Sequence, residues 1–362
     1  MTTQTASTPV NGDEVGTIIN YEDWKQFVRV ERPEAPKRMT VAKYSKLTEI
    51  EQEDYNYARG EHHRQICWVN TPASAKFAEK LDDRLYLNRG STPKAQASMG
   101  IIVSGPSTAG KTSVITQRLR SYERSLRRRE PETFDNLECE RIPILYLQVP
   151  SPCTPKTITQ SALAYLGLPT TGSTEIVTQR LAESARRLRV EIIVFDDIHF
   201  MDTSASGTAA DNHAKNLISR IRAVPIFAGI GLGDHNFFNG DNTGQNANRH
   251  SKVHIEHIDL DESCTDGTSR YRVWDQIVKT FEGAMVLLRQ KDTDLTNMAD
   301  YLHNRTDGNL GSLAELLAIG AKRAISNGDE RLSIELLDRI EIDGAAQERY
   351  NNNKKSDKGQ KK

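Results

Sequence analysis

The stretch Met99–Ile115, MGIIVSGPSTAGKTSVI, decides the fold of this chain. It opens with a short apolar run, Met99–Ser104, which predicts a buried β-strand. The next eight residues, Gly105–Thr112, match the pattern GxxxxGK(S/T) at every position. Apolar residues at helical spacing then predict a helix that extends to about Glu130. A glycine-rich loop between a strand and a helix is the context in which this pattern binds phosphate.

Each part of this loop has a chemical role toward a nucleoside triphosphate. Backbone N–H groups form a concave nest for phosphate oxygens, and Gly110 lets the chain turn closely around them. Lys111 reaches the β- and γ-phosphates and counts among the catalytic residues, while the Thr112 hydroxyl ligates Mg²⁺. The predicted ATP-binding residues are Gly105, Pro106, Ser107, Thr108, Ala109, Gly110, Lys111, Thr112 and Ser113.

A second apolar run ends in two carboxylates. Ile192–Phe195 (IIVF) precedes Asp196 and Asp197. We interpret Asp196 as the carboxylate that holds Mg²⁺ together with the Thr112 hydroxyl. Asp197 is the candidate general base for the attacking water. The alternative interpretation of these two aspartates is a solvated turn at the end of a strand.

Strands and helices alternate around these motifs. Further buried strands are predicted at 142–149, 190–195 and 224–229, separated by helical patterns at 155–166, 174–188 and 210–221. Such alternation predicts an α/β fold, a parallel sheet covered by helices on both faces. From about Ser269 onward the patterns are helical only, and we expect no strands there. A helix that begins at Thr71-Pro72 is predicted to precede the first strand.

These patterns divide the chain into five parts. The first and last have no periodicity, and the last is basic (NNNKKSDKGQKK), so both are predicted to be disordered. The predicted parts are a disordered segment 1–20, a helical extension 21–98, an αβα nucleotide-binding domain 99–260, a helical lid domain 261–345 and a disordered basic tail 346–362.

Composition excludes some functions and leaves others open. Lys+Arg 48 against Asp+Glu 49 gives a net charge of −1, which argues neither for nor against a nucleic-acid partner. We expect no membrane association, because the sequence has no apolar run long enough to span a bilayer. The start lacks the features of a secretory signal, and four scattered cysteines favour a reducing, cytoplasmic setting over a zinc site.

Arginines cluster on the helix after the phosphate loop. The arginine stripe, as we call it, consists of Arg120, Arg124, Arg127 and Arg128. These residues share one face at helical spacing. They are candidates for contacting DNA phosphates without reading the sequence, and the alternative is an ordinary solvated helix face.

Four stretches give the chain a resemblance to the TniB/TnsC group of AAA+ ATPases, relatives of MuB that serve DDE transposases. Three of them contain VSGPSTAGKTSVI, PILYLQVPSPCTPKTITQSALAYLGLP and IIVFDDIHFM. The fourth is GNLGSLAELLAIGAKRAISNG, which is similar to the family's lid. The resemblance implies an AAA+ P-loop αβα domain followed by a small all-helical lid.

The resemblance also implies a function. Such proteins bind double-stranded DNA in an ATP-dependent way, assemble as rings or helical filaments, mark a target site, and recruit or activate the transposase. The expected partners are duplex DNA, a DDE transposase, a TniQ-like target-selection protein and further copies of this chain. The expected location is the cytoplasm, in association with the nucleoid.

The resemblance also implies a catalytic arginine supplied by the neighbouring subunit. Arg249 is the candidate, and the alternative is an ordinary surface residue. The sequence departs from the family at three places. Asp197 stands where the family commonly has glutamate, so we expect slow, DNA-stimulated hydrolysis. Gly231 stands at the end of the fourth strand, where the family usually has a polar residue, such as threonine, that senses the γ-phosphate. The lid segment Gly308–Gly311 (GNLG) lacks the arginine that has a similar sensing role in AAA+ proteins. The alternatives are a helicase-loader-like or defence-associated AAA+ ATPase, a P-loop kinase, and a scaffold that binds ATP but scarcely hydrolyses it.

Overall fold

The computed structural model describes residues 18–31, 34–65, 68–89, 99–130, 133–134, 139–151, 153–198, 205–232, 250–265, 267–342, 347–348 and 350. Contacts divide the chain into two compact units. Unit 1 comprises residues 1–31, 76–105 and 111–254, and unit 2 comprises residues 32–75, 106–110 and 255–362. None of the described helices is long and apolar enough to cross a membrane.

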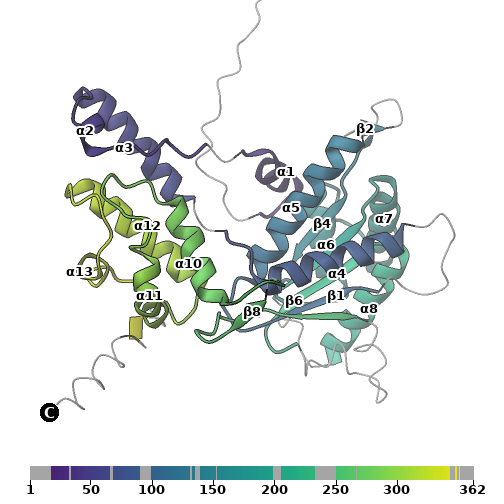
Figure 1. The fold of residues 1–362 in the computed structure, drawn as a ribbon. Coiled ribbons are helices and arrows are strands. Elements are labelled where there is room, and N and C mark those ends of the chain that lie inside the picture. Colours follow the sequence, from purple (N-terminus) through teal and green to yellow (C-terminus); the bar gives the residue numbers. More distant parts are fainter. Residues whose placement is uncertain are drawn as a thin grey trace, which may run out of the picture. The chain divides into compact units, whose positions relative to one another are not determined.

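Unit 1 contains a five-stranded parallel sheet in the order β4-β5-β6-β1-β7, with helices flanking it (Figure 1). The strands are β1 (Ile101–Ser104), β4 (Ile144–Gln148), β5 (Ile192–Asp196), β6 (Val224–Gly229) and β7 (Ser251–His254). The first four lie where apolar runs predict them, because strands buried on both faces need continuous apolar sequence. The expected α/β fold is confirmed.

The helices of unit 1 also follow the sequence pattern. α6 begins at Pro155 behind a Thr154–Thr157 capping box, which satisfies orphan backbone N–H groups at its start. The predicted helix after Thr71 is α4, which begins at Pro72. The remaining helices of this unit are α1 (Tyr21–Arg29), α5 (Lys111–Arg129), α7 (Thr174–Arg187) and α8 (Ala205–Ile221).

Five of the described strands were missed by the sequence patterns. β7 is an edge strand with one buried residue, Val253, so its sequence SKVH carries no apolar run. β8 (Ser263–Thr265) and β9 (Arg270–Arg272) form a short exposed antiparallel pair. The expectation that strands end by Ser269 is therefore wrong, because a short solvated hairpin needs no apolar periodicity. A further short pair, β2 (Thr133–Phe134) and β3 (Cys139–Glu140), follows α5.

The described part of unit 2 is helical apart from that hairpin, and its helices pack around an apolar core. Trp274, Phe281, Leu302 and Leu317 lie in this core with at most 1% of their surface exposed. Its helices are α2 (Val41–Tyr44), α3 (Glu49–Arg64), α10 (Val273–Ala284), the 3₁₀ turn η3 (Thr296–Met298), α11 (Ala299–Thr306), α12 (Leu310–Ser326) and α13 (Ile334–Leu337). The lid that the sequence predicted is present as the α10–α13 region.

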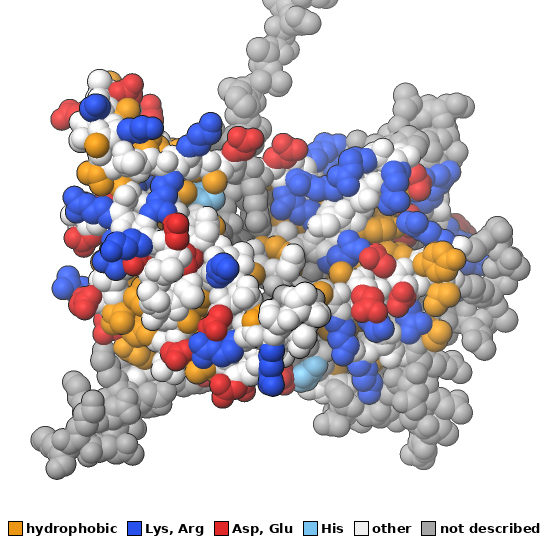
Figure 2. Space-filling model, viewed as in Figure 1, with side chains coloured by type: hydrophobic (Ala, Val, Ile, Leu, Met, Phe, Trp, Pro, Cys, Tyr) orange, Lys and Arg blue, Asp and Glu red, His pale blue; other side chains and the backbone are white. Residues whose placement is uncertain are grey.

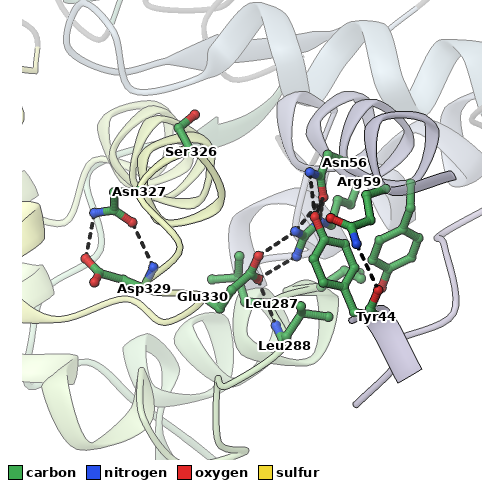
Figure 3. Close-up of polar contacts among 12 residues, drawn as sticks. Tyr44, Asn56, Arg59, Leu287, Leu288, Ser326, Asn327, Asp329 and Glu330 are labelled. Carbon is green, nitrogen blue, oxygen red and sulfur yellow. Dashed lines mark hydrogen bonds and ion pairs between the residues drawn. The ribbon is translucent and has the colours of Figure 1, made fainter. Parts of the chain in front are cut away.

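A buried ion pair joins α3 to the loop after α12 within unit 2 (Figure 3). The Arg59 guanidinium donates to both carboxylate oxygens of Glu330, at 2.6 and 2.5 Å, and its side chain is completely buried. Tyr44 and Tyr55 lie beside the guanidinium, with ring centroids 5.5 and 5.1 Å from its Cζ. The segment predicted as a helical extension thus contributes α1 and most of α4 to unit 1, and α2 and α3 to unit 2.

Candidate nucleotide-binding site

The phosphate loop leaves the carboxyl end of β1 and enters α5, at the sheet edge where α/β proteins bind ligands. Two of its residues adopt left-handed backbone conformations, Thr108 with φ 63° and Gly110 with φ 87°. A Cβ atom added at Gly110 would meet no neighbour. The positive φ, rather than lack of space, is therefore the reason for glycine at this position.

Lys111 is the first residue of α5, and only 7% of its surface is exposed. Its ammonium donates to the Gly105 carbonyl at 3.1 Å, so the side chain lies back along the loop. Burial lowers the pKa of Lys111 from its ordinary value, and the nearby Asp196 and Asp197 carboxylates oppose this shift. A phosphate placed on the loop would be a further anionic partner for this buried cation.

The two predicted metal ligands meet. Thr112 Oγ1 donates to Asp196 Oδ2 at 2.8 Å, and Asp196 is 2% exposed at the end of β5. A hydroxyl and a carboxylate are the hard oxygen donors that Mg²⁺ accepts. The residues present therefore fit a magnesium ion, and Thr112 and Asp196 would hold it.

Asp197, the candidate base, has an unusual backbone. Its φ is 58°, a left-handed conformation that is uncommon outside glycine but tolerated by aspartate. Its N–H donates to Asp196 Oδ1 at 3.0 Å, and this contact ties the two residues together. Strained backbone of this kind concentrates at functional sites, where it aims a side chain that a relaxed chain would point elsewhere.

Tyr146 is a site residue that sequence reasoning missed. It lies on β4, pairs in register with Val194, and donates its hydroxyl to Asp196 Oδ2. Burial, followed by the Asp196 charge, raises the pKa of this phenol well above its usual value. One signal was available in the sequence: a side chain with a polar tip stands inside the otherwise apolar run ILYL.

Asn309 is a second missed residue, in the GNLG segment that lacks an arginine. Its side-chain oxygen caps α12 by accepting from Gly311 N–H at 2.8 Å and Ser312 N–H at 3.2 Å. Its amide nitrogen donates to Thr108 at 3.4 Å (carbonyl oxygen) and 3.3 Å (Oγ1), and both residues belong to unit 2. The lid segment therefore contacts the phosphate loop through an amide.

Three members of the arginine stripe contact α1. Arg120 and Arg124 donate to the Val30 carbonyl, and Arg124 also reaches the Val28 carbonyl at 2.6 Å. Arg127 donates to the Tyr21 hydroxyl at 2.7 Å. Arg128 is exposed. Figure 2 shows Lys and Arg side chains gathered over the part of unit 1 that contains α5.

The other predicted features lie at the margin of the site or beyond it. Arg249 lies outside the described residues, so its place relative to the phosphate loop stays a prediction. Gly231 follows β6 with φ 63° and has open space where a Cβ would be. Next to it, Leu232 N–H donates to Ser104 Oγ at 3.1 Å, which joins the ends of β6 and β1.

Comparisons with known proteins agree on family and fold. The family model "Bacterial TniB protein" matches residues 59–259, which is more than half of the chain. None of the curated proteins matches the sequence significantly.

Two solved structures share the fold. The ORC1 protein of Aeropyrum pernix, solved in complex with DNA, has a TM-score of 0.50 at 19% identity, over 73% of this chain and 62% of that one. The ORC2 protein of Aeropyrum pernix, with ADPNP and ADP, has a TM-score of 0.55 at 13% identity, over 80% of this chain and 71% of that one. At these identities the likeness establishes the fold alone. The chain spans less than two thirds of the ORC1 protein.

Proposed function

This chain belongs to the bacterial TniB family and has an AAA+ fold, and on that premise we propose that it is an ATP-dependent DNA-binding regulator of transposition. In this proposal it assembles as rings or filaments on duplex DNA, marks the target site, and recruits or activates a DDE transposase. A TniQ-like protein is the proposed partner in target selection. The proposed location is the cytoplasm, in association with the nucleoid, because the protein would assemble on chromosomal or plasmid DNA.

One observation carries the ATPase part of the proposal: Thr112 and Asp196 converge beside Lys111 at the carboxyl end of the sheet. In the proposed reaction Lys111 neutralises charge on the β- and γ-phosphates. Asp197 orients the attacking water and accepts its proton as the γ-phosphorus leaves the bridging oxygen. A magnesium ion held by Thr112 and Asp196 would supply further charge neutralisation at the phosphates.

We expect turnover to be slow and stimulated by DNA. An aspartate side chain is one methylene shorter than the glutamate usual in the family, about 1.5 Å. Displacements of this size reduce general-base catalysis steeply. Arg249 from a neighbouring subunit is the proposed source of the remaining charge stabilisation, and DNA would accelerate hydrolysis by bringing subunits together.

The arginine stripe remains the proposed DNA contact, with Arg128 as its exposed member. Arg120, Arg124 and Arg127 hold α1, so Arg128 is the member of the stripe that we propose to contact DNA phosphates directly. Phosphate contacts of this kind bind without sequence preference. The predicted consequence is a sequence-tolerant, strongly salt-dependent affinity.

Lys111→Ala tests the proposal. Without the ammonium, ATP should no longer support assembly on duplex DNA, and negative-stain images should show no rings or filaments. A conservative Lys111→Arg variant serves as the control for folding, checked by circular dichroism. Normal ATP-dependent assembly by Lys111→Ala would overturn the role assigned to the phosphate loop.

An ATP-controlled scaffold is the second candidate, and Asp197 is the observation that favours it. Here ATP binding alone would hold the assembly and turnover would be negligible. Steady-state phosphate release with and without duplex DNA separates the two. Stimulated, Lys111-dependent release supports the ATPase, and assembly on DNA without release supports the scaffold.

A further inference from the structure

A chain of contacts within unit 1 links the N-terminal helix α1 to the carboxylate at the end of β5. Trp24 of α1 is completely buried and stacks on the ring of Tyr146, with centroids 6.2 Å apart and an interplanar angle of 12°. The hydroxyl of that tyrosine donates to Asp196 Oδ2. A residue in a segment remote from the motifs is thus two contacts away from a predicted metal ligand.

Polar contacts fix Trp24 from the other side. Its indole N–H donates to Glu123 Oε2 at 2.6 Å, and Glu123 is completely buried on α5. The second oxygen of that carboxylate accepts from Arg127 at 3.0 and 2.5 Å. Buried polar groups of this kind have strict geometric demands, so they hold the indole in one position.

The carboxyl end of α1 is held by the arginine stripe. Helices end with unsatisfied carbonyl groups and a partial negative charge, which cations stabilise. Arg120 and Arg124 supply this at the Val28 and Val30 carbonyls, and the Arg120 guanidinium also lies 4.9 Å from the Phe27 ring centroid. Three arginines of α5 thus keep α1, and with it Trp24, docked on unit 1.

Tyr146 is suited to hold Asp196 independently of a metal ion. Three groups donate to this carboxylate: the Thr112 hydroxyl, the Tyr146 hydroxyl and the Asp197 N–H. Thr112 is itself an expected metal ligand. Tyr146 and the Asp197 backbone are therefore the donors that orient the carboxylate without competing for magnesium.

We propose that Tyr146 is a positioning residue for Asp196 and that docked α1, through Trp24, holds Tyr146 in place. Undocking of α1 then weakens metal-dependent ATP binding and hydrolysis, so α1 is a control element of the nucleotide site. This inference rests on the proposed ATPase function. It makes the N-terminal segment a regulatory input to the site, rather than only a docking surface for a partner.

Tyr146→Phe tests the first link. Phenylalanine keeps the ring that stacks on Trp24 and removes only the hydroxyl. Affinity for adenylyl imidodiphosphate, measured by isothermal titration calorimetry in EDTA and in Mg²⁺, should be unchanged in EDTA and about 10-fold weaker than wild type in Mg²⁺. The kcat for ATP should fall about 10-fold.

Tyr122→Phe is the matched control. Tyr122 is also buried in unit 1 and donates to a carboxylate, Glu191, at 2.6 Å. Glu191 precedes β5, at the opposite end of that strand from Asp196. This variant loses the same chemical group and should keep wild-type affinity in both titrations. Equal effects of the two variants would reduce Tyr146 to a packing role and overturn the proposal.

Trp24→Phe and Trp24→Ala test the second link. The phenylalanine variant retains an aromatic face for Tyr146, whereas the alanine variant removes it. We expect Trp24→Ala to reproduce the Mg²⁺-specific loss of Tyr146→Phe, with partial rescue in Trp24→Phe. Arg124→Gln, which loosens α1 without altering the core, should shift Mg²⁺-dependent affinity in the same direction. If Trp24→Ala and Arg124→Gln both keep wild-type affinity in Mg²⁺, α1 does not control the nucleotide site.

The calorimetric readout keeps this inference distinct from the ATPase proposal. A wild-type protein that hydrolyses no ATP would sink the proposed turnover, yet the comparison of titrations in EDTA and Mg²⁺ would still decide the role of Tyr146. Conversely, if hydrolysis depends on Lys111 and yet is unchanged in Tyr146→Phe, that result would support the proposed function and contradict the inference.

Discussion

Arg59 and Glu330 lie 271 residues apart in the sequence and form a two-pronged ion pair inside unit 2. Glu330 adopts φ 56°, and its carboxylate also accepts from Leu288 N–H at 3.1 Å. The pair is buried on both sides, with 0% and 8% of the side chains exposed. It fixes α3 to the helices of the lid region, so the lid is completed by a segment that precedes the phosphate loop in sequence.

Arg59→Met should strongly destabilise the protein, because it leaves the Glu330 carboxylate buried without its cation. Losses of this kind cost about 3–5 kcal/mol. Denaturation in urea, followed by circular dichroism, measures the change. Arg64→Met is the matched control, since Arg64 pairs with Glu61 at the surface and exposed pairs contribute about 0–1 kcal/mol. Similar losses for both variants would contradict the importance of the buried pair.

A double variant, Arg59→Met with Glu330→Leu, should be more stable than Arg59→Met alone. Removing both charges eliminates the desolvation cost that the single variant leaves behind. If the double variant is as unstable as the single one, the left-handed backbone at Glu330 or the packing around it matters more than the charges.

Unit 2 should lose stability in mild acid because of His63. This side chain is 1% exposed, and its Nε2 accepts from Val286 N–H at 2.9 Å, which requires a neutral ring. Burial, with smaller contributions from His62 and Arg59, lowers the pKa of His63 to about 3. Between that value and an unfolded pKa of about 6.5 the unfolded state binds more protons, so stability falls as pH falls through this window.

The expected loss from His63 is about 2 kcal/mol between pH 7 and pH 5. Urea midpoints at the two pH values measure it. His63→Gln keeps an acceptor for the Val286 N–H but cannot titrate, so its midpoints should differ less. His254→Gln removes a histidine at an exposed position of β7 and serves as the control, so its urea midpoints should shift with pH as those of the wild type do. A wild-type midpoint that does not move between the two pH values would contradict the burial of a neutral His63.

Asn309 should couple the lid segment to the phosphate loop through its amide nitrogen. Asn309→Asp keeps the side-chain oxygen that caps α12 but removes the donor to Thr108, whereas Asn309→Ala removes both. We expect Asn309→Ala to lose about 1 kcal/mol of stability and Asn309→Asp to lose little. Both variants should alter ATP affinity, measured by calorimetry. Wild-type affinity in Asn309→Asp would limit Asn309 to a helix cap.

Arg128 and Arg129 are exposed at the end of α5 and should carry the salt dependence of DNA binding. Replacing both by alanine removes two potential phosphate contacts, which should lower the slope of log affinity against log salt by about 1.8. Fluorescence anisotropy with labelled duplex at several salt concentrations measures the slope. Arg180→Ala with Arg186→Ala, on α7, is the control. An unchanged slope in the α5 variant would show that this surface is an ordinary solvated helix face that does not contact DNA phosphates.

Strands β1, β4, β5 and β6 and the phosphate loop could be predicted because their signals are local. A strand buried on both faces needs a continuous apolar run, and the loop pattern prescribes residue types at fixed spacing. The meeting of Thr112 and Asp196 was predictable for the same reason, while their role as metal ligands stays a prediction. Thr112 and Asp196 each close a recognisable local motif, and the parallel sheet necessarily brings the ends of β1 and β5 to one edge.

The role of the arginine stripe could not be predicted in full. Its spacing shows only that four cations share a helix face, and that face suits DNA phosphates and helix carbonyls equally. The tertiary structure places the carboxyl end of α1 against Arg120 and Arg124, and Tyr21 at its amino end against Arg127. Tyr146 and Asn309 were missed for a related reason, because each acts on a partner that lies far away in the sequence.

By itself, the sequence determined the parallel sheet and the local motifs at its edge, the GxxxxGK(S/T) loop and the strand that ends in Asp196, because steric and hydrophobic periodicities act over a few residues. Only the tertiary structure decided which polar groups surround these motifs. Asp196 meets Tyr146 across neighbouring strands, Trp24 meets Tyr146 from α1, and Arg59 meets Glu330 from the two ends of the chain. Buried polar groups find partners through the three-dimensional packing of the chain, and no local pattern records that choice.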